Sequence, residues 1–145
     1  MISTERFVLL FSLVMVVVFV TAIMVSSKGL GIEVAECLPV EKTFTEGRVS
    51  KLDDHTYRVY YVAGMWSFDP AVVEVPLESE LDIYLTSKDV VHGIHISDKN
   101  VNLMAVPGTI NNTRVKFHKR GEYQVVCHEY CGTGHQNMLG KIIVK

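Results

Sequence analysis

The sequence has few cysteines, no basic block and no sustained helical pattern after residue 30. Three cysteines are an odd number, which excludes a framework in which every cysteine is paired in a disulfide. The formal net charge is −2 and no segment is rich in lysine and arginine, so we expect no nucleic-acid partner. Internal repeats and low-complexity segments are also missing. A chain of 145 residues has room for one domain with a core, but not for two domains and an anchor.

A long apolar run is present near the N-terminus. Phe7 to Val25 spans 19 residues, of which only Ser12 and Thr21 are polar. As a helix this run would rise about 28 Å, close to the hydrocarbon thickness of a bilayer. The alternative is a cleaved signal peptide, but the run is longer than a usual signal core and no small-x-small cleavage site follows it cleanly. We therefore predict a retained single-pass anchor in contact with membrane lipid; Arg6 before it and Lys28 after it do not set its orientation.

The composition changes after this run. Glycine, serine, proline and charged residues predict a linker over residues 28–46, between an anchor at 1–27 and a soluble domain at 47–145. Cys37 lies alone in the predicted linker and matches no ligand pattern, so we interpret it as a thiol outside the functional site.

Short runs of alternating apolar and polar residues fill the predicted domain. The clearest are 57–63, 81–86 and 113–117, and shorter ones follow at 121–126 and 141–144. Such alternation is typical of strands with one buried face. Seven to nine short strands in about 100 residues predict an all-β fold, either a sandwich or a small Greek-key barrel.

Four soft metal ligands lie between the last two predicted strands. They are Cys127, Cys131, His135 and Met138. Thiolate, imidazole and thioether together favour copper. A mononuclear copper site of this type uses one cysteine, so one thiolate is left over and the pair could bridge two metals. A second imidazole would then be needed, and His92, 35 residues before Cys127, is the best candidate.

Other interpretations of this loop stay open from the residues alone. The two cysteines could form a disulfide, or a closed zinc site with histidines, although methionine is a poor zinc ligand. They could also serve a membrane-anchored copper chaperone or thiol-redox protein. That class usually places its cysteine pair on a βαβ scaffold, for which the helices are missing here.

Two motifs resemble a known family. Asp89-x-x-His92-x-x-His95, followed by Cys127-x-Glu129-x-Cys131-Gly-x-Gly-His135-x-x-Met138-x-Gly140, is similar to subunit II of haem-copper cytochrome c oxidase. The resemblance extends over residues 57–145, and the single predicted helix is similar to the compact B-type bacterial and archaeal branch. It implies a cupredoxin-like Greek-key domain.

The resemblance also implies a ligand set for a binuclear CuA centre with two copper ions. Cys127 and Cys131 would bridge the metals, and His92 and His135 would each bind one. The remaining ligands would be the side chain of Met138 and the backbone carbonyl oxygen of Glu129. The Glu129 side chain would in addition reach a Mg²⁺ at the boundary with subunit I.

The implied function is electron transfer. In this family the centre accepts electrons from cytochrome c and passes them to haem in subunit I, which reduces dioxygen to water and moves protons. The chain would then be an oxidoreductase subunit that relays electrons, with no catalytic residues of its own. The domain would face the periplasmic side of a bacterial or archaeal cell membrane. A CuA subunit of a nitric-oxide reductase is the alternative within this interpretation.

The surface residues of the site are less clearly indicated. Family members usually have a tryptophan where this chain has Gly64, so Trp66 and Phe68 become candidates for the residue through which electrons enter, or else for core aromatics. His95 and His128 are candidates for side chains that contact a ligand or a partner surface.

Overall fold

The computed structural model describes residues 4–30, 36–39 and 43–145. They form two units, divided between residues 33 and 34. The first contains helix α1 (Thr4–Leu30), whose apolar side chains from Phe7 to Val25 are all exposed. The mean hydropathy of this helix reaches 3.1, and its length and composition suffice to cross a bilayer. Thr21 donates its hydroxyl hydrogen bond to the carbonyl of Val17 one turn earlier, as expected for a polar side chain in an apolar helix.

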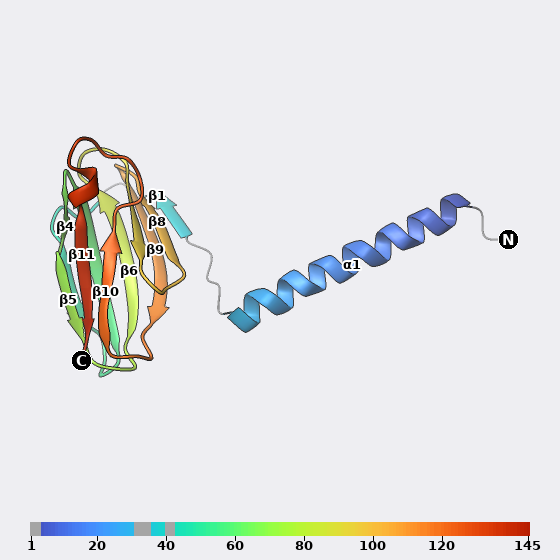
Figure 1. Cartoon of the computed structure of the whole chain (residues 1–145), viewed down its shortest axis with the longest axis horizontal. Coiled ribbons are helices and arrows are strands. Elements are labelled where there is room, and N and C mark those ends of the chain that lie inside the picture. Colours follow the sequence, from blue (N-terminus) through green and yellow to red (C-terminus); the bar gives the residue numbers. More distant parts are fainter. Residues whose placement is uncertain (1–3, 31–35, 40–42) are drawn as a thin grey trace. The chain divides into compact units, whose positions relative to one another are not determined.

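The second unit is a sandwich of two sheets (Figure 1). One sheet has the order β1-β9-β6-β3-β2, with β4 paired to β3, and the other has the order β5-β11-β10-β7-β8. The strands are β1 (Glu36–Pro39), β2 (Arg48–Lys51), β3 (Thr56–Gly64), β4 (Ser67–Asp69), β5 (Val72–Val75), β6 (Glu80–Ser87), β7 (His92–Ile96), β8 (Val101–Ala105), β9 (Thr109–Lys116), β10 (Gly121–Val126) and β11 (Leu139–Val144). The pairs β3–β6 and β5–β11 are parallel, and the other pairs are antiparallel. The prediction of an all-β domain that follows one apolar helix in the sequence is confirmed.

Part of the range predicted as a linker has regular structure. Helix α1 continues to Leu30, and β1 pairs with β9, with Cys37 opposite Asn111. Residues 31–35 and 40–42 lie outside the described residues. Strand β1 was not indicated by its sequence because its pairing partner lies about 70 residues further along the chain.

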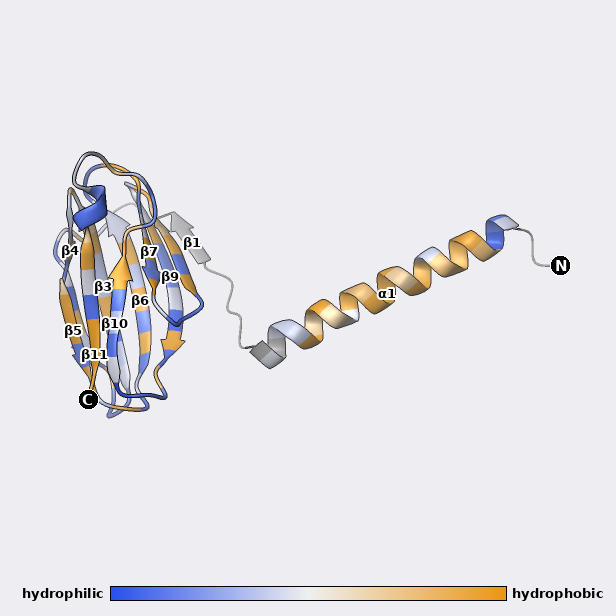
Figure 2. Ribbon diagram, viewed as in Figure 1, coloured by the Kyte–Doolittle hydropathy of each residue, from blue (hydrophilic) through white to orange (hydrophobic). Residues whose placement is uncertain are grey.

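The core lies between the two sheets, and strands on both sides alternate in hydropathy (Figure 2). Side chains exposed by 2% or less come from both sheets: Val59, Tyr61, Leu81, Ile83, Leu85, Ile94, Ile96, Leu103, Val125 and Ile142. Burying each large aliphatic side chain of this kind stabilises the fold by about 1.5–3 kcal/mol. This core is the rigid support on which the loops at one end of the sandwich stand.

One strand departs from its predicted pattern. The sequence places Asp82 and Thr86 of β6 on the outer face, yet they are only 5% and 1% exposed. Arg58 on the neighbouring strand covers Asp82 with a hydrogen bond of 3.0 Å, and Thr86 donates one of 2.7 Å to the carbonyl of Thr109. These two side chains of β6 are therefore covered by polar partners on the neighbouring strands instead of being solvated.

Candidate metal centre

The two loop cysteines lie side by side at one end of the sandwich. Their Sγ atoms are 3.8 Å apart, and each residue is 4% exposed. Both thiols are free, and their separation is well beyond the ~2.05 Å of a disulfide bond. The disulfide considered from the sequence is therefore not formed in this structure.

The connection between β10 and β11 carries these cysteines. The N–H of Cys127 donates to the carbonyl of Met138 across the base of the loop at 3.2 Å, where the paired strands begin. The short 3₁₀ helix η1 (His135–Asn137), shown in red in Figure 1, forms the far side of the loop. A loop pinned at both ends by neighbouring strands keeps its side chains in fixed positions.

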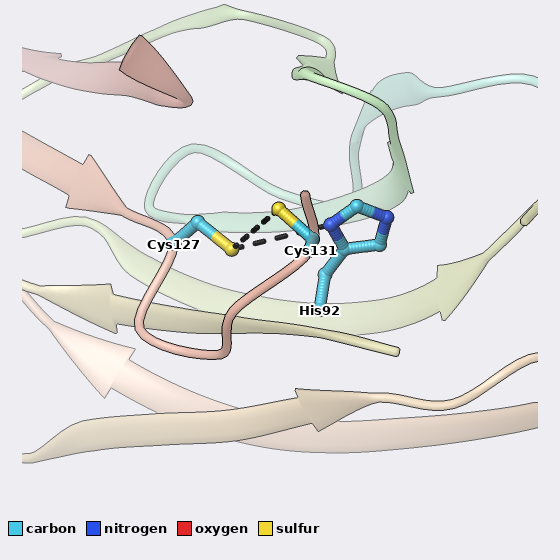
Figure 3. A group of neighbouring side chains, drawn as sticks. All are labelled: His92, Cys127 and Cys131. Atoms are coloured by element: carbon cyan, nitrogen blue, oxygen red, sulfur yellow. Dashed lines mark hydrogen bonds between the residues drawn. The ribbon is translucent and has the colours of Figure 1, made fainter. Parts of the chain in front are cut away.

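His92 is brought to the cysteines by the fold. It is the first residue of β7 and is fully buried, with its Nδ1 atom 4.0 Å from the Sγ of Cys127 (Figure 3). The ligand atoms of His92, Cys127 and Cys131 all lie within 4.8 Å of one another. The sandwich thus closes the gap of 35 residues between this histidine and the loop.

The remaining predicted ligands surround the same two sulfur atoms. Nδ1 of His135 lies 3.5 Å and Sδ of Met138 lies 3.7 Å from the Sγ of Cys131. The carbonyl oxygen of Glu129 lies 3.3 Å from the Sγ of Cys127. Each thiol therefore has one imidazole beside it, and all six predicted ligand groups meet in one place.

This donor set fits copper better than it fits zinc. Two thiols, two imidazoles and a thioether are soft donors, and they exceed the four ligands of a closed zinc site. Burial, and then the neighbouring Cys127 thiol, raise the pKa of the Cys131 thiol to about 11. A cation between the sulfurs would supply the charge that favours two thiolates here. The residues present therefore fit a bound copper centre.

Asp89 orients the buried histidine. Its Oδ1 atom lies 2.7 Å from Nε2 of His92, and its Oδ2 atom accepts a hydrogen bond of 2.7 Å from the N–H of Met65. Burial raises the pKa of Asp89, but hydrogen bonds from His92, Met65 and Val90 outweigh that effect, so the pKa lies below its usual value. With Nε2 bonded to the carboxylate, Nδ1 is left to face the sulfur atoms. The sequence indicated Asp89 only as part of a motif, although its place three residues before His92 was a signal for this role.

Trp66 and Phe68 occupy different environments. Trp66 is 41% exposed in the turn between β3 and β4, and its indole N–H donates to the carbonyl of Cys131 at 3.1 Å. Phe68 is 2% exposed and packs in the core, with its ring centroid 6.3 Å from that of Tyr61. Tyr130, which the sequence did not single out, is 77% exposed, and its ring centroid lies 5.8 Å from that of His135.

The two other candidate histidines have different surroundings. His95 points to the exposed outer face of β7. The ring of His128 lies over Gly93, where an added Cβ atom would be 2.3 Å from it. Nδ1 of His128 is 3.4 Å from the Glu129 carboxylate, whereas its buried Nε2 atom has no hydrogen-bond partner among the described residues. His128 thus packs the connection between β10 and β11 (residues 127–138, the ligand loop) against the strand that carries His92.

The sandwich defines a cupredoxin-like domain, and its cluster of thiols, imidazoles and a thioether is a candidate soft-metal site. Residues 47–145 match the family model described as cytochrome C oxidase subunit II, periplasmic domain. The chain belongs to this family, in which the domain is of the CuA type.

Relatives and solved structures agree with this placement. A cytochrome c oxidase subunit 2 of Thermus thermophilus is 43% identical over 89 residues, which are 61% of this chain and 66% of that protein. A second subunit 2 from the same species has the same identity, with 53% of its length covered, so the match spans about half to two thirds of these relatives. A chain from the cryo-EM structure of a heme-copper terminal oxidase dimer superposes with a TM-score of 0.82 at 43% identity, covering 97% of this chain and 99% of that one. The periplasmic domain of subunit II of cytochrome oxidase from Bradyrhizobium japonicum shares the fold, with a TM-score of 0.57 at 22% identity, over 61% of this chain and 83% of that one.

Proposed function

We propose that this chain accepts single electrons from a cytochrome c at a two-copper centre. It passes them to haem in subunit I of a haem-copper oxidase, where dioxygen is reduced to water. The observation that carries the proposal is the pair of free, buried thiols 3.8 Å apart, each with its own imidazole at 3.5–4.0 Å. A mononuclear site would leave one of the two thiols without a role.

The six ligand groups would have different tasks. Cys127 and Cys131 would hold the two copper ions through their thiolates, His92 and His135 through their imidazoles, and Met138 and the carbonyl of Glu129 would complete the set. Bound copper would supply one-electron redox chemistry. The chain itself shields these groups from solvent, since Met138 and His92 are fully buried and both cysteines nearly so.

Rigidity is the second contribution of the chain. An electron carrier works best when its ligands move little between oxidation states. The Cys127–Met138 backbone hydrogen bond and the Asp89–His92 bond fix the two sides of the site before any electron arrives. Together with the surrounding core, they would tune the redox potential of the site through burial and through hydrogen bonds to its ligands.

Trp66 is the best candidate for the residue through which electrons enter. Its exposed ring is linked to the ligand loop by one hydrogen bond to the carbonyl of Cys131. Phe68 is buried in the core and does not reach the surface where a donor protein would bind.

The placement of the protein in the cell is also part of the proposal. Helix α1 would cross a bacterial or archaeal cell membrane once, in contact with lipid, and the copper domain would lie on the periplasmic side. The Glu129 carboxylate, whose side chain is 43% exposed, would offer one oxygen to a Mg²⁺ at the boundary with subunit I. That subunit would have to supply further ligands, because Mg²⁺ demands six oxygen donors in octahedral geometry.

Copper loading of the full chain in detergent tests the proposal. We expect two copper ions per chain and an EPR spectrum of one unpaired electron shared by both. The Cys131→Ser variant should lose the shared-electron signal. The Ser97→Ala variant should keep it, because Ser97 follows the last residue of β7 whereas His92 is the first. A single copper in the unmodified chain, or a metal-free disulfide, would contradict the proposal. The gas consumed by the complex that co-purifies with the chain, dioxygen or nitric oxide, separates an oxidase from a reductase.

A further inference from the structure

The turn between β3 and β4 touches both halves of the ligand set. Met65 and Trp66 are the two residues between the paired positions Gly64 and Ser67. The N–H of Met65 donates to one oxygen of Asp89 at 2.7 Å, and the other oxygen of the same carboxylate lies 2.7 Å from the ring of the ligand His92. This turn is therefore connected, through the Asp89 carboxylate, to the histidine at the start of β7.

Trp66 connects the same turn to the ligand loop. Its indole N–H donates to the carbonyl of Cys131 at 3.1 Å, a contact between residues 65 positions apart. The ring lies against Gly132 and Gly134, and a Cβ atom at Gly134 would be 2.3 Å from it. Only glycine at position 134 lets the indole approach this closely. Gly132 in addition has a φ of +113°, which disfavours any other residue there.

Among the described residues, the backbone hydrogen bonds of the ligand loop lie within the loop itself. They hold its base, from Cys127 to Met138, and its far side, from His135 to Gly132, from Asn137 to Gly134 and from Met138 to His135. The contact of His128 with Gly93 joins the loop to β7 but does not involve Cys131. Two glycines give the intervening segment conformational freedom that must be lost when metal binds. A contact from outside the loop already restricts this freedom in the metal-free protein, so less conformational entropy is lost when metal binds.

We propose that the Met65–Trp66 turn is a clasp that fixes the spacing between His92 and the Cys131 loop before metal binds. Trp66 is then a positioning residue for the metal ligands, separately from any part it has in receiving electrons. This inference rests on the proposed copper site. It adds that the exposed aromatic residue sets the affinity and electronic structure of that site.

The Trp66→Phe variant tests the clasp, because it keeps an aromatic ring but removes the indole N–H. Loss of a hydrogen-bonded partner of a metal ligand typically lowers metal affinity 10–100-fold. We expect the copper affinity of the full chain in detergent to fall at least about tenfold, with a changed copper hyperfine splitting in the EPR spectrum. The matched control is Tyr123→Phe, which removes a similar bond of 2.9 Å to the carbonyl of Lys119. That carbonyl precedes β10 whereas the ligand loop follows it, so the control should change neither quantity.

A double-mutant cycle with Gly134→Ala tests the packing. In the unmodified chain the added methyl group must displace the indole, so copper affinity should fall and the spectrum should change. In a Trp66→Ala background the obstacle is gone, and the same substitution should have a smaller effect. Thermal unfolding of the metal-free proteins identifies any variant that fails to fold, and in that case Trp66→Phe carries the test.

Three outcomes are decisive. An unchanged affinity and spectrum in Trp66→Phe would overturn the clasp, even if electron transfer from a donor became slower. Equal effects of Gly134→Ala in both backgrounds would also overturn it. Failure of the unmodified chain to bind two copper ions would instead overturn the proposed function, so the two failures are distinguishable.

Discussion

Asp89 shows how a residue outside the predicted ligand set can orient one within it. His92 is fully buried, so a hydrogen bond to its Nε2 atom cannot be replaced by one to bulk water. The Asp89 carboxylate supplies that bond at 2.7 Å and thereby leaves the Nδ1 atom toward the sulfur of Cys127. A ligand histidine with a fixed ring loses less freedom on binding metal.

We predict that Asp89→Ala lowers copper affinity by about 10–100-fold, because the imidazole loses its orienting partner. Competition with a copper chelator measures this change. The Asp54→Ala variant is the control, since that side chain is 91% exposed and pairs with Lys51. Copper affinity within twofold of the unmodified protein in Asp89→Ala would contradict the role given to this carboxylate.

At the scale of elements, turns hold the strands in register. The turn between β2 and β3 is closed by Asp53, whose Oδ1 atom accepts hydrogen bonds of 2.9 Å from the N–H of His55 and 2.7 Å from that of Thr56. These bonds hold the pKa of Asp53 below its usual value, and the bond from His55 has the largest effect. The charged carboxylate therefore stabilises the hairpin.

The stabilisation from Asp53 should depend on pH. Its pKa is lower in the folded than in the unfolded chain, so its contribution is complete above the unfolded value of about 4 and is lost as the pH falls through the folded value. We predict that Asp53→Ala lowers the free energy of unfolding at pH 7 and that this difference shrinks in acid. Urea unfolding across this pH range measures it, with Asp53→Asn, which keeps an acceptor oxygen but cannot titrate, as the control. A difference that stays the same at all pH values would exclude the carboxylate as its source.

At the scale of the whole molecule, the chain consists of two units that differ in where their apolar side chains lie. Helix α1 exposes apolar side chains along its length, whereas the sandwich encloses its own core. Strand β1, just after the helix, lies at the edge of one sheet and covers β9. The proposed copper site is built from the sandwich alone, since all its proposed ligands lie within residues 92–138.

We predict that a fragment starting at residue 34 is soluble without detergent and binds as much copper as the full chain. The reason is that it keeps both sheets and loses only the apolar helix. Gel filtration and copper analysis check this. A fragment starting at residue 47 is the comparison, and its melting temperature should be lower because β1 and the contact of Phe44 with Tyr60 are removed. Aggregation of the longer fragment would contradict an independent sandwich.

Several features could be predicted because their signals are local. A long, almost wholly apolar run indicates a helix suited to a bilayer, and strict alternation over 113–117 indicates one buried face. Strand β1 and the burial of Asp82 could not be predicted, because both depend on partners in other strands. Single residues do not encode which strand will lie beside them.

The sequence by itself determined the soft donors of the loop, since they lie within 12 consecutive residues and their chemistry is a property of the side chains. His92 was predicted only as the best candidate, because nothing local shows which distant histidine a fold will bring near. The tertiary structure placed it 4.0 Å from Cys127 and gave it Asp89 as a partner. It also placed Trp66 at the surface and Phe68 in the core. Chemistry is carried by residue type, whereas distance and burial arise only when strands far apart in the chain pack together.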